Sequence, residues 1–73
     1  MYIVELSVPK EKLMDVIENF ESEIDYIEVP PQIGWFFSTR YKIRLKFHST
    51  LKEVMELLQK HGLDNYIDRI YGH

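Results

Sequence analysis

The spacing of hydrophobic and polar residues changes several times along the chain, and each change marks a predicted element. Residues 2–7 alternate loosely and are rich in strand formers, which predicts a strand. From Lys10 the spacing is helical, and we expect a helix over about residues 9–23, with Pro9 in its first turn. The apolar stripe of this helix is formed by Leu13, Val16, Ile17, Phe20 and Ile24.

The middle of the chain predicts two extended segments on either side of a proline turn. Residues 26–29 predict a short strand that ends at Pro30 and Pro31, because each proline fixes φ and lacks an amide donor. Residues 30–34, PPQIG, are predicted to form a loop without regular structure. Residues 35–47 predict extended chain, which is long for one strand given a usual range of ~3–10 residues. We therefore expect a bend near Ser38 and Thr39.

The segment after residue 48 predicts a second amphipathic helix with recognisable ends. Thr50 and Glu53 match a capping box, and Gly62 is typical of a helix stop, with Leu63 as its apolar partner. The buried stripe of this helix consists of Leu51, Val54, Met55 and Leu58.

The last segment, residues 63–71, fits two structures. Its β-branched and aromatic residues favour a strand, and a helix this short is rarely stable. The strand would put Tyr66, Asp68 and Ile70 on one side and Ile67, Arg69 and Tyr71 on the other. The alternative helix would have an apolar stripe of Leu63, Tyr66, Ile67, Ile70 and Tyr71.

The resulting order, β-α-β-β-α-β without internal repeats, predicts one α+β domain over residues 1–73. This order is that of the ferredoxin-like split βαβ sandwich. Right-handed crossovers would place both helices on one face of a four-stranded antiparallel sheet and leave the other face bare. The first and third strands would lie at the centre. If the last segment is helical instead, the order becomes β-α-β-β-α-α.

Residues 40–48, RYKIRLKFH, alternate between basic and apolar residues, so one side of the predicted strand is cationic and the other is apolar. The apolar positions, which we expect to face the helices, are Tyr41, Ile43, Leu45 and Phe47. The positions expected on the bare face are Arg40, Lys42, Arg44, Lys46 and His48. The row contains four of the nine lysines and arginines, although the net charge of the chain is -3.

Three interpretations of this cationic row remain open. The first is a solvated face whose cations pair with Glu5 and with Glu28 or Asp68 on neighbouring strands. The second is a surface that docks a protein, since long basic side chains cover apolar area while their charged heads pair. The third is binding of nucleic-acid phosphates by the cations of the row. This binding would be nonspecific, because the row offers no aromatic residue on which bases could stack. Eight of the twelve acidic residues precede Pro30, so the first helix also offers an acidic surface complementary to the row.

Residues 30–37, PPQIGWFF, form the second unusual stretch. Trp35, Phe36 and Phe37 are adjacent, and in extended chain they cannot all face one core. At least one should be exposed or covered by a partner, and Trp is enriched at binding hot spots. We therefore take Ile33, Trp35 and Phe36 as candidate partner-binding residues. The alternative is that Trp35 or Phe36 folds back over the edge of the core.

Composition narrows the class of protein. The chain has 73 residues and no cysteine, which excludes disulfides and thiolate sites and fits the cytoplasm. No apolar run approaches the ~20 residues of a membrane span, and Glu5 interrupts the first apolar run, so we expect no membrane segment or signal peptide. An aromatic content of 14% in so small a domain makes a homodimer an open possibility.

No sequence motif in the chain indicates an enzymatic activity. The glycine-rich nucleotide-binding patterns are absent. His48, His61 and His73 occupy ordinary positions, and His61 with Asp64 would make only a weak metal site. We predict no catalytic residue, metal or cofactor.

The sequence thus favours a cytoplasmic, non-enzymatic binding or regulatory module, such as an inhibitor or adaptor of a larger protein partner. Its expected contacts are the 30–37 loop and the residues Arg40, Lys42, Arg44 and Lys46. Nonspecific nucleic-acid binding through the same row is the first alternative. The second is a ligand sensor or an enzyme whose site lies at a subunit interface.

Overall fold

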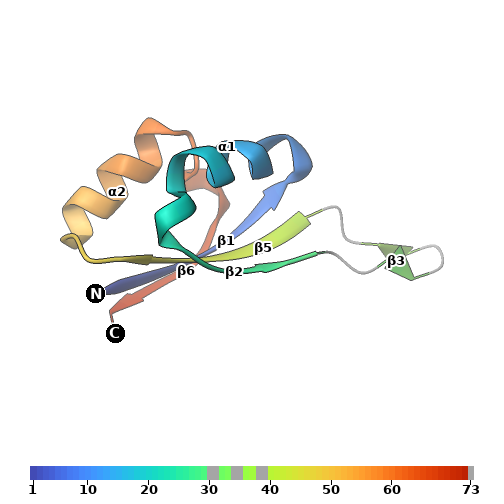
Figure 1. The fold of residues 1–73 in the computed structure, drawn as a ribbon, viewed down its shortest axis with the longest axis horizontal. Coiled ribbons are helices and arrows are strands. Elements are labelled where there is room, and N and C mark those ends of the chain that lie inside the picture. Colours follow the sequence, from blue (N-terminus) through green and yellow to red (C-terminus); the bar gives the residue numbers. More distant parts are fainter. Residues whose placement is uncertain (30–31, 34–35, 38–39, 73) are drawn as a thin grey trace.

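A four-stranded antiparallel sheet, covered on one face by two helices, forms the body of the protein (Figure 1). The structure is a computed structural model that describes residues 1–29, 32–33, 36–37 and 40–72. The first half contains β1 (Tyr2–Pro9), α1 (Lys10–Phe20), the 3₁₀ turn η1 (Glu21–Glu23) and β2 (Ile24–Glu28). The second half contains β5 (Arg40–Phe47), α2 (Leu51–Lys60), the 3₁₀ turn η2 (Asp64–Tyr66) and β6 (Ile67–Gly72). Between the halves lie two short strands, β3 (Gln32–Ile33) and β4 (Phe36–Phe37).

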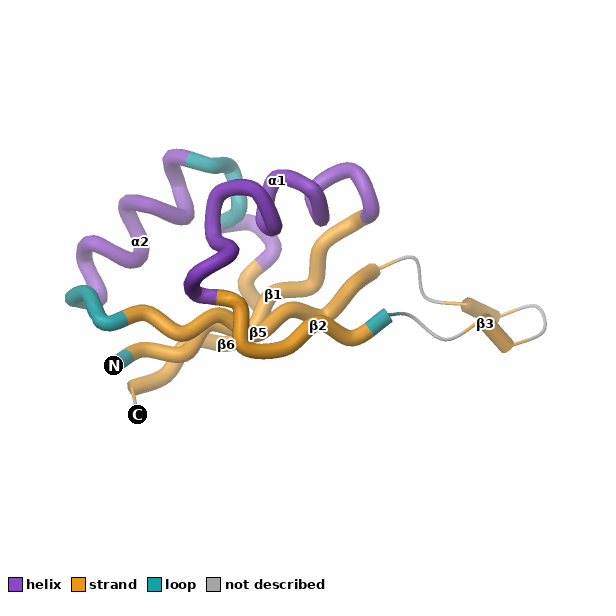
Figure 2. Tube along the Cα trace, in the orientation of Figure 1, coloured by secondary structure: helices purple, strands orange, loops and turns teal. Residues whose placement is uncertain are grey.

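The strand order β2-β5-β1-β6 confirms the predicted ferredoxin-like α+β fold. β1 and β5 are the central pair, and both edge strands run antiparallel to their neighbours. The helices α1 and α2 lie side by side on the same face of this sheet (Figure 2). None of the described elements covers the opposite face, which we term the open face.

Alternating residues of the two central strands build the core against the helices, as predicted. β1 contributes Val4, Leu6 and Val8, and all three are at most 1% exposed. The other buried residues of this cluster are Val16, Phe20, Ile43, Leu45, Phe47, Val54, Leu58 and Leu63. Phe20 packs edge-on against Phe47, with 5.9 Å between ring centroids. Because these positions point toward the helices, the residues between them on β1 and β5 point toward the open face.

Both predicted ends of α2 are confirmed. The Thr50 hydroxyl accepts a hydrogen bond from the Glu53 amide at 3.3 Å, which caps the first turn. Gly62 has φ 67°, a left-handed conformation that favours glycine. The amides of Gly62 and Leu63 donate to the carbonyls of Gln59 and Leu58, at 3.0 and 2.8 Å. This pair of bonds is a Schellman stop, and it buries Leu63 completely.

The last segment is a strand, as we favoured, and the helical alternative is wrong. The strand begins later than expected, because η2 takes up Asp64–Tyr66 before β6 starts at Ile67. The predicted division of its side chains between the two faces is also wrong. Ile67 and Ile70 both pack against the core, whereas Asp68 and Arg69 between them are both exposed. A register shift in the pairing of β6 with β1 causes this departure from simple alternation.

A separate hairpin of β3 and β4 projects from the body, and its presence corrects the predicted loop. Gln32 pairs with Phe37 and Ile33 pairs with Phe36, so residues 32–33 do have regular structure. Figure 1 places β3 beyond the ends of β2 and β5, at the end of the molecule away from both chain termini. Among the described residues, this hairpin forms a sheet of its own. The predicted bend at Ser38 and Thr39 lies outside the described residues.

Candidate functional site: the open sheet face

The open face carries the predicted cationic row along β5. Arg40 and Lys42 are exposed, whereas Arg44 and Lys46 are half-buried, and none of the four belongs to the core. On the adjacent central strand the same face presents Glu5 and Ser7, each between core positions of β1. The prediction that these cations share one face of a central strand is therefore confirmed.

A β-bulge in β2 brings two consecutive side chains onto the open face. Ile24 pairs with Leu45 and Tyr26 pairs with Arg44, so Asp25 is an extra residue in the edge strand. In such a bulge two residues oppose one on the partner strand. Asp25 and Tyr26 thus both stand on the open face next to Arg44.

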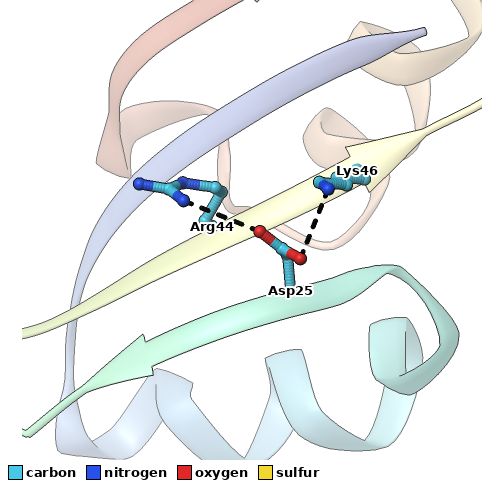
Figure 3. Close-up of polar contacts among 3 residues, drawn as sticks. All are labelled: Asp25, Arg44 and Lys46. Carbon is cyan, nitrogen blue, oxygen red and sulfur yellow. Dashed lines mark ion pairs between the residues drawn. The ribbon is translucent and has the colours of Figure 1, made fainter.

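Asp25 and Tyr26 hold Arg44 from two sides. The Asp25 carboxylate lies between two cations, with Oδ2 at 3.6 Å from Arg44 Nη1 and Oδ1 at 3.4 Å from Lys46 Nζ (Figure 3). The Arg44 guanidinium carbon lies 5.6 Å from the centroid of the Tyr26 ring, a cation–π contact. Arg44 Nε is buried and has no hydrogen-bond partner in the described part of the chain. Arg44 is thereby fixed in place while most of its donors stay unused.

A second bulge, in β6, repeats this arrangement on the other edge. Arg69 pairs with Glu5 and Ile67 pairs with Leu6, so Asp68 is the extra residue. The Asp68 carboxylate accepts a hydrogen bond from the Ser7 hydroxyl. Arg69 Nε lies 3.8 Å from Glu5 Oε1, and the Arg69 guanidinium lies 4.5 Å from the centre of the Tyr71 ring. Each edge of the face thus carries an aspartate at a bulge and an arginine–tyrosine pair.

The two bulges come from a sequence repeat that our sequence analysis missed. Residues 24–27 read I-D-Y-I and residues 67–70 read I-D-R-I, each after a 3₁₀ turn at the end of a strand–helix unit. The signal was available, because core isoleucines three residues apart break the two-residue period of a strand. Asp25 and Tyr26 are the most important open-face residues that were not predicted.

For Lys42, Arg44 and Lys46, the predicted ion-pair partners are wrong. Glu5 pairs with Arg69 of β6, and Asp68 bonds to a hydroxyl. Glu28 is opposite Lys42 in register, yet no described carboxylate lies within the 4.0 Å ion-pair limit of Lys42. Asp25, placed by the bulge, pairs with Arg44 and Lys46 instead.

Arg40 differs from the rest of the row. Its Nη1 donates to the main-chain carbonyl of Ser7 at 3.2 Å, and its guanidinium lies 5.6 Å from the centre of the Tyr66 ring. These contacts tie Arg40 to the body at the hairpin end of β5. The cations of the row without a contact to the main chain of β1 are therefore Lys42, Arg44 and Lys46 among the described residues.

A shallow depression of about 300 Å³ lies at the middle of the open face. Its cationic lining comes from Lys42, Arg44 and Arg69, and its anionic lining from Glu5, Glu28 and Asp68. Tyr26 forms part of its wall. Such a surface suits a partner with localised charges better than a uniformly charged one.

Four acids offset the five cations of the open face as far as it is described. The cations are Arg40, Lys42, Arg44, Lys46 and Arg69, and the acids are Glu5, Asp25, Glu28 and Asp68. The acids lie on strands next to β5 or next to β1, about 4.8 Å from their neighbours. A wide polyanion would meet them together with the cations, which lowers the attraction of this face for phosphate chains.

The remaining candidate residues lie away from this cluster. Ile33 and Phe36 pair with each other in the β3–β4 hairpin, and Trp35 lies outside the described residues. His48 is exposed just after β5, and the His61 ring packs edge-on against Phe20 at 5.2 Å.

The described residues contain neither a metal-binding cluster nor a membrane-spanning helix. No group of three or more histidine, aspartate or glutamate side chains is arranged there to hold a metal ion. Neither helix in that part of the chain has the length and hydropathy needed to cross a bilayer.

Comparison with protein-family models found no match for this chain. The curated proteins and the solved structures gave no significant match either.

Proposed function

We propose that this chain is a non-enzymatic protein-binding module that docks its partner on the open face. The observation that carries the proposal is the pair of arginine–tyrosine contacts on that face, Arg44 with Tyr26 and Arg69 with Tyr71. Arginine and tyrosine are among the residues most enriched at interface hot spots. Both pairs are held in place within one chain and still reach solvent, with side-chain exposures of 42% for Arg44 and 68% for Arg69.

Preorganisation is the physical reason why these side chains suit docking. Ordering a flexible side chain at an interface costs about 0.5–1.5 kcal/mol. Asp25 and Tyr26 already restrict Arg44, and Glu5 and Tyr71 already restrict Arg69. Most of this entropic cost is therefore met during folding, and a partner gains more from each contact.

The β3–β4 hairpin supports the same proposal and suggests a homodimer. Its sequence includes Ile33, Phe36 and Phe37, yet its strands lie beyond the sheet and the helices do not cover it (Figure 1). An isolated two-stranded hairpin is only marginally stable in water. We propose that a second copy or the partner protein completes the environment of this hairpin.

The absence of cysteine makes the cytoplasm the compartment that we propose. There the module would serve as an adaptor or an inhibitor of a larger protein. In this proposal the partner contacts both the hairpin and the open face.

Affinity purification from source cells with matched variants tests the docking face. The wild-type chain should recover a protein that is lost with Tyr26→Ala or Arg69→Ala and retained with Lys52→Ala, an exposed lysine of α2 on the far side of the sheet. A partner recovered equally by all of these chains would show that docking does not use the open face. Sedimentation equilibrium of the wild type and of Phe36→Ser tests the homodimer, which predicts a dimer that the substitution weakens.

Nonspecific nucleic-acid binding is the second candidate function, favoured by the cationic row of β5. It predicts an affinity that falls steeply with salt. The slope of log affinity against log salt concentration should become shallower by about one unit for each lysine or arginine that is neutralised. Anisotropy of labelled single-stranded RNA at low and moderate salt distinguishes the two candidates. Tight, salt-sensitive binding that is lost in Arg44→Glu would place nucleic acid first.

A further inference from the structure

We propose that the depression around Arg44 and Lys42 receives side-chain carboxylates of an extended acidic segment in the partner. This inference rests on the proposed protein-binding function and names the chemistry that the open face recognises. It follows from the unused donors of Arg44, the unpaired state of Lys42 and the regular spacing of the row.

Arg44 has donors to spare. A guanidinium carries five N–H groups, and a carboxylate fits two of them side by side. Among the described residues, the carboxylate within the 4.0 Å ion-pair limit of Arg44 is that of Asp25, which is at 3.6 Å and is shared with Lys46. This separation exceeds ordinary hydrogen-bond length. One carboxylate shared by two cations leaves one positive charge of this cluster without a counterion.

Lys42 adds a second unpaired charge to the same depression. Its ammonium has no carboxylate within the ion-pair limit among the described residues, although Lys42 and Arg44 line the depression together. Two other lining acids are occupied, Glu5 by Arg69 and Asp68 by Ser7. A carboxylate that enters the depression would therefore meet cations with unused donors.

The geometry of β5 favours an extended segment as the carrier of these carboxylates. Lys42, Arg44 and Lys46 follow at every second residue, so their spacing along the strand is ~6.6–6.8 Å. Alternate side chains of another extended chain have the same spacing. A segment one strand wide also covers fewer acids of the edge strands than a nucleic-acid duplex, which is far wider.

Glu28 makes the inference sharply testable. It lines the depression and is opposite Lys42, but it forms no ion pair with that lysine. Its charge would repel an incoming carboxylate, so Glu28→Gln should strengthen binding. A structural role alone would not produce a gain of affinity from this substitution.

The test uses the full chain and fluorescence anisotropy of an end-capped, labelled peptide of alternating glutamate and threonine. The same peptide with lysine in place of glutamate is the ligand control, and Lys52→Ala is the protein control. We expect binding of the acidic peptide alone, weakened by salt. Arg44→Lys, which keeps the charge but loses the paired donors, should weaken binding roughly two- to fivefold, and Glu28→Gln should strengthen it by a similar factor. Lys42→Ala should weaken it as well and serves as the second variant, because Lys42 has no ion pair to lose.

Three results would overturn the inference. The first is no binding of the acidic peptide at low salt, and the second is equal affinity of wild type, Arg44→Lys and Lys42→Ala. The third is a single-stranded oligonucleotide that binds more tightly than the peptide and is lost in the same variants, which would identify phosphate as the ligand. If the peptide fails but the purification remains sensitive to Tyr26→Ala, the module binds protein through a different chemistry. If both fail, the open face is not a docking surface.

Discussion

Replacing Asp25 by asparagine removes the carboxylate that pairs with Arg44 and Lys46 of the cationic row. The side chain keeps its size and stays compatible with the bulge, where short polar residues are readily accommodated. What is lost is the charge that Arg44 and Lys46 share, at 3.6 and 3.4 Å. The two cations then repel each other on the same side of β5.

The expected loss of stability follows from these separations and from exposure. A unit pair at such a distance is worth about 1 kcal/mol in a water-like dielectric. Measured exposed pairs contribute about 0.2–1 kcal/mol each, because solvent screens them and side-chain entropy opposes them. The side chains of Asp25, Arg44 and Lys46 are 33–43% exposed, so values in this range apply. We therefore expect Asp25→Asn to lower the free energy of unfolding by about 1 kcal/mol, or the Tm by roughly 5 °C in a domain of this size.

Thermal and urea denaturation at low salt and in 1 M NaCl would measure this loss and its origin. At 1 M the Debye length is about 3 Å, comparable to the separations in the cluster, so the difference between wild type and Asp25→Asn should fall by half or more. Asp68→Asn is the matched control, since Asp68 occupies the corresponding bulge of β6 but bonds to the neutral Ser7 hydroxyl. Its effect should be smaller and almost independent of salt.

Three outcomes would refute the reasoning. Asp25→Asn with the stability of the wild type at low salt would mean that Asp25 does not organise the cationic row. A loss of the same size at low and high salt would assign the effect to the backbone of the bulge and not to charge. Equal losses for Asp25→Asn and Asp68→Asn would lead to the same conclusion.

Three further substitutions test the fold that supports the site. Phe20→Ala should cost about 3–5 kcal/mol, because the ring is 1% exposed and packs edge-on against Phe47, and a loss below about 1.5 kcal/mol in urea denaturation would contradict that packing. Gly62→Ala should lower the free energy of unfolding by about 1–2 kcal/mol, because alanine is strained at its φ of 67°. Gly72→Ala is the control and should be nearly neutral, because Gly72 is in extended chain. Similar Tm values for the two variants would argue against the helix stop. Thr50→Ala should cost about 1 kcal/mol and Thr50→Ser far less, because serine keeps the capping oxygen; equal losses would exclude the cap.

The fold could be predicted from the sequence because in most elements the hydrophobic residues recur at the regular spacing of a strand or a helix. The alternation of β5 separates core from cations without exception, and α2 is bounded by a capping pair and a glycine stop. The β3–β4 hairpin could not be predicted in the same way, because strands of two residues contain no period to detect. Pro30 and Pro31, which precede this hairpin in the sequence, also favoured the prediction of a loop.

The bulges explain both the ambiguity and the main error of the sequence analysis. Ile67 and Ile70 are three residues apart, which imitates one turn of a helix and made a helical end plausible. In the structure the same spacing is that of a strand with one extra residue. The predicted strand also began at Tyr26, two residues later than β2 does, so Asp25 was left outside it and the residues that hold Arg44 could not be recognised. A paired I-D-x-I motif in two edge strands is the signal to look for in such chains.

The bulges also decide which surfaces are left for association. A free sheet edge invites pairing with another chain, and bulges and charged residues oppose such pairing. Both edge strands of this sheet contain a bulge, and each places an aspartate on the open face. The same two residues turn a purely cationic row into a surface of alternating charge with fixed arginines. Edge pairing is thereby disfavoured and attraction for a uniform polyanion is reduced, which leaves the open face suited to a partner whose charges are placed at matching positions.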